Sequence, residues 1–336
     1  MKGINALIAL LLAVLFSLVS CRKEPVSISI QNRLDKATES NFDGVILSVY
    51  QDGEVSLYSA GMNNKEQGIV ANPNQLFKIA SISKLYIASA CAKLIGDGTL
   101  SVDQTLAEYL PQYAARIEYA DEITLKMLLQ HRSGIPDFID DGDFSWATTG
   151  SNVLEALELA LDKKAEFKPN KRRKYSNTNY LLIGLILDSE LGYSHHEYIT
   201  SEILNPLGLS QTYATTNEVD EDAIMSGYDL SSDDDLKTWD YFIPGGSMVA
   251  TAEEVSVFIS ALNEGNLLTA TEQSIYEELY DLDHTGLLPG YQSIARYDDK
   301  TKSSVVLFMN TSGGNSWSRG ERLFRRIVRD LRWCKE

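Results

Sequence analysis

One stretch of the chain decides how the rest is interpreted, and it reads Phe77-Lys78-Ile79-Ala80-Ser81-Ile82-Ser83-Lys84 followed by Leu85-Tyr86-Ile87-Ala88-Ser89-Ala90-Cys91-Ala92. Small and apolar residues continue to Leu94 without Gly or Pro, which predicts an amphipathic helix that begins at Ser81. Lys84 lies one turn further along the same face of that helix. The pattern therefore places an amine beside a hydroxyl.

This pair has the chemistry of a nucleophile and its base. A serine is a poor nucleophile until a neighbour takes its proton, and a lysine in a partly dry cleft has a lowered pKa and can do so. The unpaired N–H groups at a helix start can hold a developing oxyanion. The alternative is a helix cap with an exposed lysine, because S-x-x-K occurs often by chance. Two further segments have to supply the rest of a site.

Composition limits the classes of partner. The chain has 336 residues, of which 44% are hydrophobic and 23% charged, as in an ordinary globular protein with one large domain or two lobes. The net charge of −17 argues against nucleic acid, since phosphate binding needs a basic surface. We expect a monomer that acts on a small-molecule or peptide substrate with an acyl group.

The first twenty residues differ from the rest and predict a secretory signal. Lys2 precedes an apolar run from Ile4 to Val19 that is too short for a comfortable membrane span. The ending Leu18-Val19-Ser20-Cys21 resembles a bacterial lipobox, which implies cleavage before Cys21 and a lipid on its sulfur. We then expect a protein of the bacterial cell envelope, anchored by lipid outside the cytoplasm. The alternative is a soluble secreted protein in which the cysteine falls there by accident.

The remaining cysteines and the histidines define no metal or cofactor site. Export makes a disulfide between Cys91 and Cys334 chemically possible, but a buried free thiol at Cys91 is an equal alternative. There is no C-x-x-C pair, and the four histidines form no H-E-x-x-H or similar spacing. We therefore expect neither a metal nor a cofactor.

Two hairpins and the helices between them predict an α+β fold. Strands at 44–50 and 55–60 flank the turn Asp52-Gly53, and strands at 291–297 and 303–309 flank a polar turn. Helical periodicity dominates from Leu94 to about Ser226, with segments at 123–130, 153–161, 179–191 and 195–204. Helices at 28–40 and 323–333 complete an antiparallel sheet flanked by helices, an α/β/α sandwich with an inserted helical lobe.

From these segments we expect a signal at 1–20, a tether at 21–27 and one domain over 28–336. In that domain an α/β lobe takes about 28–80 and 240–336, and a helical lobe takes about 81–239.

The second candidate segment of the site reads Lys174-Tyr175-Ser176-Asn177-Thr178-Asn179-Tyr180 and lies just before a helix. In an extended loop Tyr175 and Asn177 point the same way. A phenol near a cationic lysine ionises more easily and can act as a base or return a proton to a leaving group, while an amide can hold a substrate carbonyl and the lysine. The alternative is an interface aromatic and a helix cap.

The third segment is Asp283-His284-Thr285-Gly286-Leu287-Leu288-Pro289-Gly290, at the start of the C-terminal strands. Gly286 lets another backbone lie against the strand. His284 could donate to a substrate carboxylate or to the tyrosine oxygen, or it is an ordinary surface histidine. The chain has no G-x-S-x-G elbow, which weakens an α/β-hydrolase interpretation.

Taken in order, Ser81-x-x-Lys84, Tyr175-x-Asn177 and His284-x-Gly286 resemble the serine penicillin-recognising family. The closer likeness is to the branch that holds class C β-lactamases, D-alanyl-D-alanine carboxypeptidases and related esterases. Three further segments resemble motifs of that branch: 123–136 (ITLKMLLQHRSGIP), 205–212 (NPLGLSQT) and 245–254 (GGSMVATAEE). The likeness runs from about Gly44 to Asn310 and implies a β-lactamase/transpeptidase-like fold.

The resemblance also implies roles for single residues. Ser81 attacks a carbonyl, and Lys84 with Tyr175 moves the protons. The backbone N–H groups of Ser81 and Leu287 form an oxyanion hole. Asn177 positions the substrate amide. The remaining strand residues, His284, Thr285 and Gly286, face the carboxylate of the substrate or assist the tyrosine.

The chain departs from the class C pattern where that pattern has Lys-Thr-Gly, because His284 is largely neutral near pH 7. His-Thr-Gly resembles the carboxypeptidase and esterase members more, so we expect activity of that kind on peptides, esters or amides, and not efficient hydrolysis of antibiotics. The helical lobe at 134–161 and the loop at 228–244 are expected to frame the entrance. Arg172 and Arg173 could lie near its rim and favour an acidic substrate, but solvated surface charges are the preferred interpretation. The alternative function is a catalytically weak protein that keeps the fold and binds a cell-wall fragment or a partner.

Overall fold

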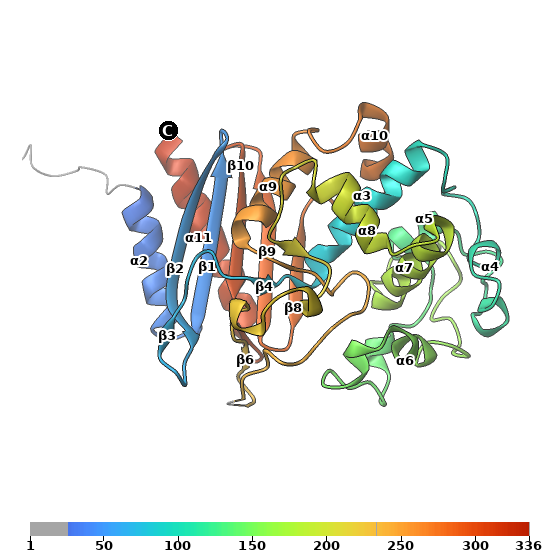
Figure 1. The fold of residues 1–336 in the computed structure, drawn as a ribbon, viewed down its shortest axis with the longest axis horizontal. Coiled ribbons are helices and arrows are strands. Elements are labelled where there is room, and N and C mark those ends of the chain that lie inside the picture. The colour runs from blue at the N-terminus through green and yellow to red at the C-terminus, as the bar shows by residue number, and fades with distance from the viewer. Residues whose placement is uncertain (1–25, 233, 336) are drawn as a thin grey trace, which may run out of the picture.

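An antiparallel sheet of six strands forms the centre of the protein (Figure 1). The computed structural model describes residues 26–335 apart from 233, so the predicted signal, Cys21 and most of the tether lie outside the described residues. In spatial order the strands are β3 (Ile69–Val70), β2 (Glu54–Asn64), β1 (Gly44–Gln51), β10 (Ser303–Met309), β9 (Tyr291–Asp298) and β8 (His284–Leu288). Strand β8 therefore lies at one edge of the sheet.

Both predicted hairpins are confirmed. Strands β1 and β2 pair with Gln51 opposite Glu54, and the turn residues Asp52 and Gly53 have φ angles of 53° and 85°. Two positive φ angles match the twist of the strands, and Gly accepts them without strain. Strands β9 and β10 pair with Asp298 opposite Ser303. The pairing of β1 with β10 then joins the two ends of the chain into one sheet.

Helices cover both faces of this sheet, which confirms the predicted α+β sandwich. Helices α2 (Val26–Thr38) and α11 (Ser316–Lys335) pack together on one face, and α9 (Ala252–Asn263) covers the other (Figure 1). Side chains of α2 and α11, among them Ile30, Leu34 and Ile327, are buried against the strands. The burial of apolar area in this layer stabilises the sheet face.

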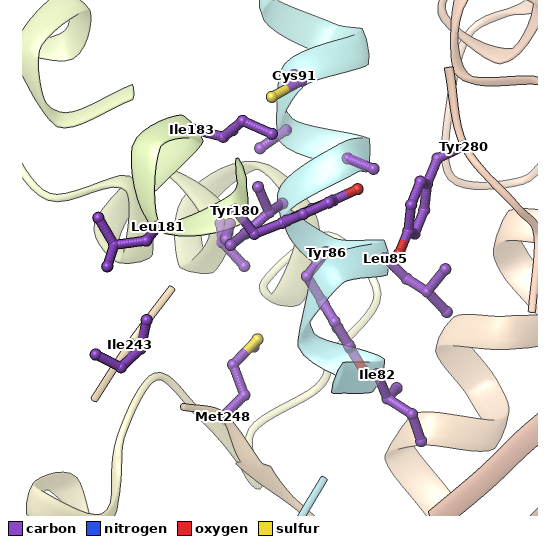
Figure 2. Close-up of a cluster of buried hydrophobic side chains, with 14 of the residues drawn as sticks. Ile82, Leu85, Tyr86, Cys91, Tyr180, Leu181, Ile183, Ile243, Met248 and Tyr280 are labelled. Carbon is purple, nitrogen blue, oxygen red and sulfur yellow. The ribbon is translucent and has the colours of Figure 1, made fainter. Parts of the chain in front are cut away.

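The remaining helices gather around α3 (Ser83–Gly96), whose surroundings Figure 2 shows. They are α4 (Leu106–Tyr109), α5 (Leu125–Leu129), α6 (Val153–Glu158), α7 (Asn177–Leu191), α8 (His195–Ile199) and α10 (Ala270–Leu279). Tyr86 of α3 stacks on Phe258 with ring centroids 3.8 Å apart. Cys91 is a free thiol buried in this core, and the side chain of Cys334 lies outside the described part.

The structure corrects three details of the predicted helices. Ser81 does not begin the long helix, because a 3₁₀ turn, η1 (Ala80–Ile82), precedes α3. Helix α3 is not amphipathic, since residues on all its faces are buried. The predicted helix at 195–204 divides into α8 and a π-helical turn at Thr200–Leu204. Helix α3 is therefore a central element of the core and not a surface helix.

Two small sheets tie distant segments to the site. Strand β7 (Val249–Ala250) pairs with β4 (Phe77–Lys78) and β5 (Thr212–Tyr213), and β6 (Tyr228–Asp229) pairs in parallel with β11 (Thr311–Ser312). The first sheet fixes the strand that leads to Ser81. Within the described residues, no helix has the length and apolarity needed to cross a membrane.

Candidate active site

Ser81 lies on a tight turn that the protein holds from several sides. Ala80, just before it, has a φ of 53°, a left-handed conformation that costs energy for a residue with a side chain. The Ile79 N–H donates to the Met248 carbonyl at 3.1 Å, and the buried Ser83 hydroxyl donates to the Ala80 carbonyl at 2.6 Å. These contacts fix the backbone on both sides of Ser81.

Lys84 is almost completely buried, with 1% of its surface exposed. Its Nζ lies 3.0 Å from Ser81 Oγ, 3.0 Å from Asn177 Oδ1 and 2.8 Å from the Gly245 carbonyl oxygen. Burial lowers the pKa of Lys84 to about 7, although the negative charge of Asp137 acts in the opposite direction. At neutral pH, Lys84 is therefore an uncharged amine in a large fraction of the molecules.

The partners of Lys84 decide where its lone pair points. A neutral amine keeps two N–H donors and gains one acceptor site. The Gly245 carbonyl and Asn177 Oδ1 can only accept hydrogen bonds, so they take the two N–H groups. The lone pair of the neutral amine then faces the Ser81 hydroxyl. This is the arrangement that a general base requires.

Tyr175 completes the contacts of the serine. Its hydroxyl donates to Ser81 Oγ at 2.8 Å, and its ring lies against the His131 ring with centroids 4.4 Å apart. Although 38% of Tyr175 is exposed, desolvation of its hydroxyl raises the pKa of the phenol well above its usual value. This corrects the expectation that Lys84 makes the phenol easier to ionise. Tyr175 is a neutral donor in the resting site.

Asn177 is the first residue of α7, and an extended Ser176 separates it from Tyr175. Besides accepting from Lys84, its side chain donates through Nδ2 to Asp137 Oδ2 at 2.9 Å. Burial raises the pKa of the Asp137 carboxyl. Asp137 therefore orients the amide so that its oxygen faces the lysine.

His284 is held by the protein on both ring nitrogens. Nδ1 lies 2.6 Å from the Thr285 carbonyl oxygen, so it carries the proton, and Nε2 lies 2.8 Å from the Tyr280 hydroxyl and accepts from it. Desolvation and the charge of Lys84 lower the pKa of His284 to about 4. His284 therefore has no free N–H group. This differs from the expectation that it donates to a substrate carboxylate or to Tyr175.

Strand β8 lies directly against the serine turn. A Cβ at Gly286 would come within 2.3 Å of the Ile79 carbonyl oxygen, and the same oxygen accepts from Ser293 Oγ on β9 at 2.9 Å. The absence of a side chain at Gly286 therefore lets the two backbones meet. Leu287, the next residue, is 55% exposed on this edge strand.

A cleft of about 620 Å³ contains Ser81, Tyr175 and Asn177 together with residues 284–289. Ile139, Trp146, Asp229 and Tyr241 also line it, which confirms that the segments at 134–161 and 228–244 frame the entrance. The far end is formed by Ser312, Gly313 and Trp317. Arg172 stacks on Phe167 and Arg173 pairs with Asp281, so neither arginine lines the cleft.

Among the described residues that line the cleft, Asp229 is the only carboxylate. Burial opposes its ionisation, but hydrogen bonds from Ser231 and Ser312 hold the pKa of Asp229 below its usual value. No Lys or Arg lines the cleft, and His284 is neutral at pH 7. The described lining is therefore negative at one end and otherwise uncharged.

A family comparison assigns the chain to a known family. The family model described as Beta-lactamase matches residues 30–281. The chain belongs to the beta-lactamase family. The match ends just before His284, so the structure alone brings strand β8 to the serine of this beta-lactamase-family protein.

Two curated relatives are similar in sequence. Penicillin-binding protein 4 of Amycolatopsis lactamdurans is 26% identical over 346 residues, which cover 90% of this chain and 89% of that protein. Protein flp of Staphylococcus aureus is 28% identical over 246 residues, which cover 68% of this chain. The chain spans about half the length of flp, since the match takes up 48% of that protein.

Two solved structures illustrate the likeness in fold. D-amino acid amidase of Ochrobactrum anthropi SV3 superposes with a TM-score of 0.83 at 23% identity, covering 93% of this chain and all of the other. FmtA of Staphylococcus aureus superposes with a TM-score of 0.74 at 22% identity, covering 93% and 91%. The chain therefore belongs to the beta-lactamase family and shares its fold with these two proteins.

Proposed function

We propose that this protein is a serine hydrolase that forms an acyl-enzyme on Ser81 and acts on D-amino-acid peptides, amides or esters in the manner of a carboxypeptidase or an esterase. The observation that carries the proposal is the buried Lys84 amine, which has a pKa of about 7 and a lone pair that faces the Ser81 hydroxyl. A solvated lysine would remain protonated and could not act as the base.

In the first step, Ser81 Oγ attacks the substrate carbonyl carbon while its proton moves to Lys84 Nζ. The carbonyl oxygen becomes an oxyanion, and the backbone N–H groups of Ser81 and Leu287 are its donors. Tyr175 then gives its proton to the leaving amine or alkoxide as the bond to carbon breaks, and the proton held by Lys84 replaces it. Water next attacks the acyl carbon and gives a proton to the neutral Lys84 amine, and Ser81 Oγ leaves and takes that proton from Lys84.

The charge of the residues that line the cleft affects which substrates bind well. A peptide that ends in a free carboxylate meets neutral donors at Thr285 and a negative Asp229 at the far end. Without a cation in the lining, that carboxylate gains no charge-assisted hydrogen bond. Amides and esters of D-amino acids carry no such charge and are the favoured substrates. The structural likeness to a D-amino acid amidase supports this choice.

Intact-protein mass spectrometry tests the proposal. The full chain is incubated with a fluorescent penicillin, a fluorophosphonate, D-alanyl-D-alanine, its amide and a short-chain ester. We expect an adduct on Ser81 that Ser81→Ala removes, and faster hydrolysis of D-alanyl-D-alanine amide than of the free acid. Ser89→Ala is the matched control, because Ser89 is buried on the same helix and donates only to the Leu85 carbonyl.

Two outcomes contradict the proposal. One is the absence of labelling and turnover of the folded protein by every compound in the panel. The other is stabilisation by a ligand that Ser81→Ala leaves intact, without any turnover, which is the behaviour of a protein that only binds in the cleft.

A further inference from the structure

Positive charge gathers at two places in this acidic protein, the stretch 163–174 and the last helix. The chain has a net charge of −17, yet α11 carries seven basic and two acidic residues. Both acids already have cationic partners, since Asp330 pairs with Arg33 and Glu321 pairs with Arg296 and Arg325. The other cations of this helix are therefore not neutralised by its own acids.

Several of these cations lie on one side of α11. Arg319, Arg322, Arg326 and Arg329 follow a spacing of three, four and three residues, which places them on one helix face. Arg319, Arg322 and Arg326 line a hollow of about 250 Å³ together with Arg33 and Lys36 of α2. We call this set of six cations the basic face. Apart from Arg33, none of them has an ion pair within the described part of the chain.

The basic face belongs to the same layer of two helices in which the described chain begins, and its hollow lies toward the end of α2 opposite to Val26. Helices α2 and α11 are antiparallel, because Ser29 and Arg33 bond to Asp330 while Lys36 shares the hollow with Arg319. They cover the side of the sheet away from the helical lobe (Figure 1). Cys21 precedes Val26 by five residues, which span at most about 17 Å when fully extended. A lipid on Cys21 would keep the basic face next to the bilayer.

We propose that the basic face binds the phosphate groups of anionic lipids in the membrane that holds the predicted lipid anchor at Cys21. An acyl anchor and a basic surface act together, because the anchor raises the local concentration and the charges add electrostatic attraction. Arg forms bidentate hydrogen bonds with phosphate oxygens, and the hollow offers three arginines without carboxylate partners. The other basic stretch, 163–174, belongs to the helical lobe and not to the α2/α11 layer.

This contact gives the protein one orientation. The α2/α11 layer faces the lipid, the sheet lies above it, and the helical lobe points away (Figure 1). The cleft lies beyond the sheet edge at β8 and near Trp317, the end of α11 opposite to Asp330. Its entrance is then directed toward substrates outside the membrane plane.

Arginine modification on vesicles tests the proposal. The full chain is reconstituted through its N-terminus into phosphatidylcholine vesicles with or without phosphatidylglycerol, and phenylglyoxal labelling of each arginine is followed by peptide mass spectrometry. We expect Arg322 and Arg326 to react several-fold more slowly on the anionic vesicles and this protection to disappear in high salt. Arg172 and Arg173 of the helical lobe should react equally on both.

Charge-reversal variants give the matched control. Arg322→Glu with Arg326→Glu should abolish the protection measured at Arg319 and Arg329, whereas Lys164→Glu with Lys168→Glu, the same change on the helical lobe, should leave it intact. Fluorophosphonate labelling of Ser81 in each variant reports that the protein is folded. Equal reactivity on both vesicle types overturns the proposal. Protection by soluble polyphosphate but not by phosphatidylglycerol also overturns it, because the partner is then a soluble polyanion.

Discussion

Two lysines six residues apart, Lys78 and Lys84, are both buried in this protein, but their surroundings differ. Lys78 Nζ donates to the carbonyl oxygens of Lys237 and Trp239 at 2.6 and 2.7 Å, and the charge of Asp240 favours its protonated form. Lys84 Nζ contacts two acceptors and the hydroxyl of Ser81. Burial lowers the pKa of Lys78 to about 8 and that of Lys84 to about 7.

The comparison of the two lysines shows that burial alone does not give a lysine a catalytic role. Burial lowers the pKa of both amines, so a lowered pKa does not by itself identify a base. What distinguishes Lys84 is a partner that can give up a proton. Lys78 faces only backbone carbonyls and ties β4 to the loop at 237–239. We therefore expect Lys84 to serve catalysis and Lys78 to serve stability.

The largest effect that separates the two lysines is expected from Lys84→Met. This substitution keeps the volume of the side chain but removes the proton acceptor, so the rate of Ser81 acylation should fall by about 10³-fold. Stopped-flow measurement with a chromogenic ester gives the rate. If acylation proceeds at the wild-type rate, another group is the base.

The same substitution at Lys78 should change stability and not rate. Lys78→Met leaves two buried carbonyl oxygens without their donor, which should lower the free energy of unfolding by about 1–3 kcal/mol. Urea denaturation followed by circular dichroism measures the loss. Acylation of the folded variant should match the wild type, and a loss comparable to that of Lys84→Met would erase the distinction between the two sites.

The pH dependence of acylation should report Lys84 and not Lys78. The neutral amine is the active form, so kcat/KM should rise about tenfold per pH unit below pH 7 and level off above it. Lys78→Met should show the same inflection. An inflection near the ordinary lysine value of 10.5 would show that Lys84 is not the group that titrates.

We expect the smallest effect on the rate from substitution of the carboxylate near each lysine. Asp137 raises the pKa of Lys84 and Asp240 raises that of Lys78. Asp137→Asn should move the inflection to lower pH and increase the rate at pH 6 by about threefold, provided that the amide still accepts from Asn177. Asp240→Asn is the matched control and should leave the profile unchanged. A shift in both variants would indicate a general loss of negative charge.

The sequence predicted which residues form the site better than it predicted their protonation states. Ser81, Lys84, Tyr175 and Asn177 are expected together because the order of their motifs resembles that of a known family, whereas each motif alone is too common to predict a site. The state of Tyr175 was predicted wrongly, since the desolvation that raises its pKa depends on the residues packed around it. Asp137 has no local signal, and the motif around Gly245 does not indicate that its carbonyl accepts from Lys84, because only the folded chain brings these groups to Asn177 and Lys84.

The fold was predictable where neighbours in sequence pair and less so elsewhere. The Asp52-Gly53 turn determines the first hairpin from four residues. The cleft wall at Asp229 depends on the parallel pairing of β6 with β11. These two strands are more than 80 positions apart in the sequence, and each has only two residues. Such short, distant strands leave no periodicity in the sequence. The boundary between η1 and α3 is likewise set by Met248, which fixes Ile79 from a distant segment.

The missing side chain at Gly286 sets a limit on how this enzyme can be redesigned. The backbones of β8 and of the turn before Ser81 leave no room for a Cβ at Gly286. A substitution there would push the edge strand outward. The site that holds the transition state would then be wider. Leu287 beside it is 55% exposed and lines the cleft, so a change of its side chain does not require the two backbones to separate. Libraries aimed at new substrates should therefore vary position 287 and leave position 286 as glycine.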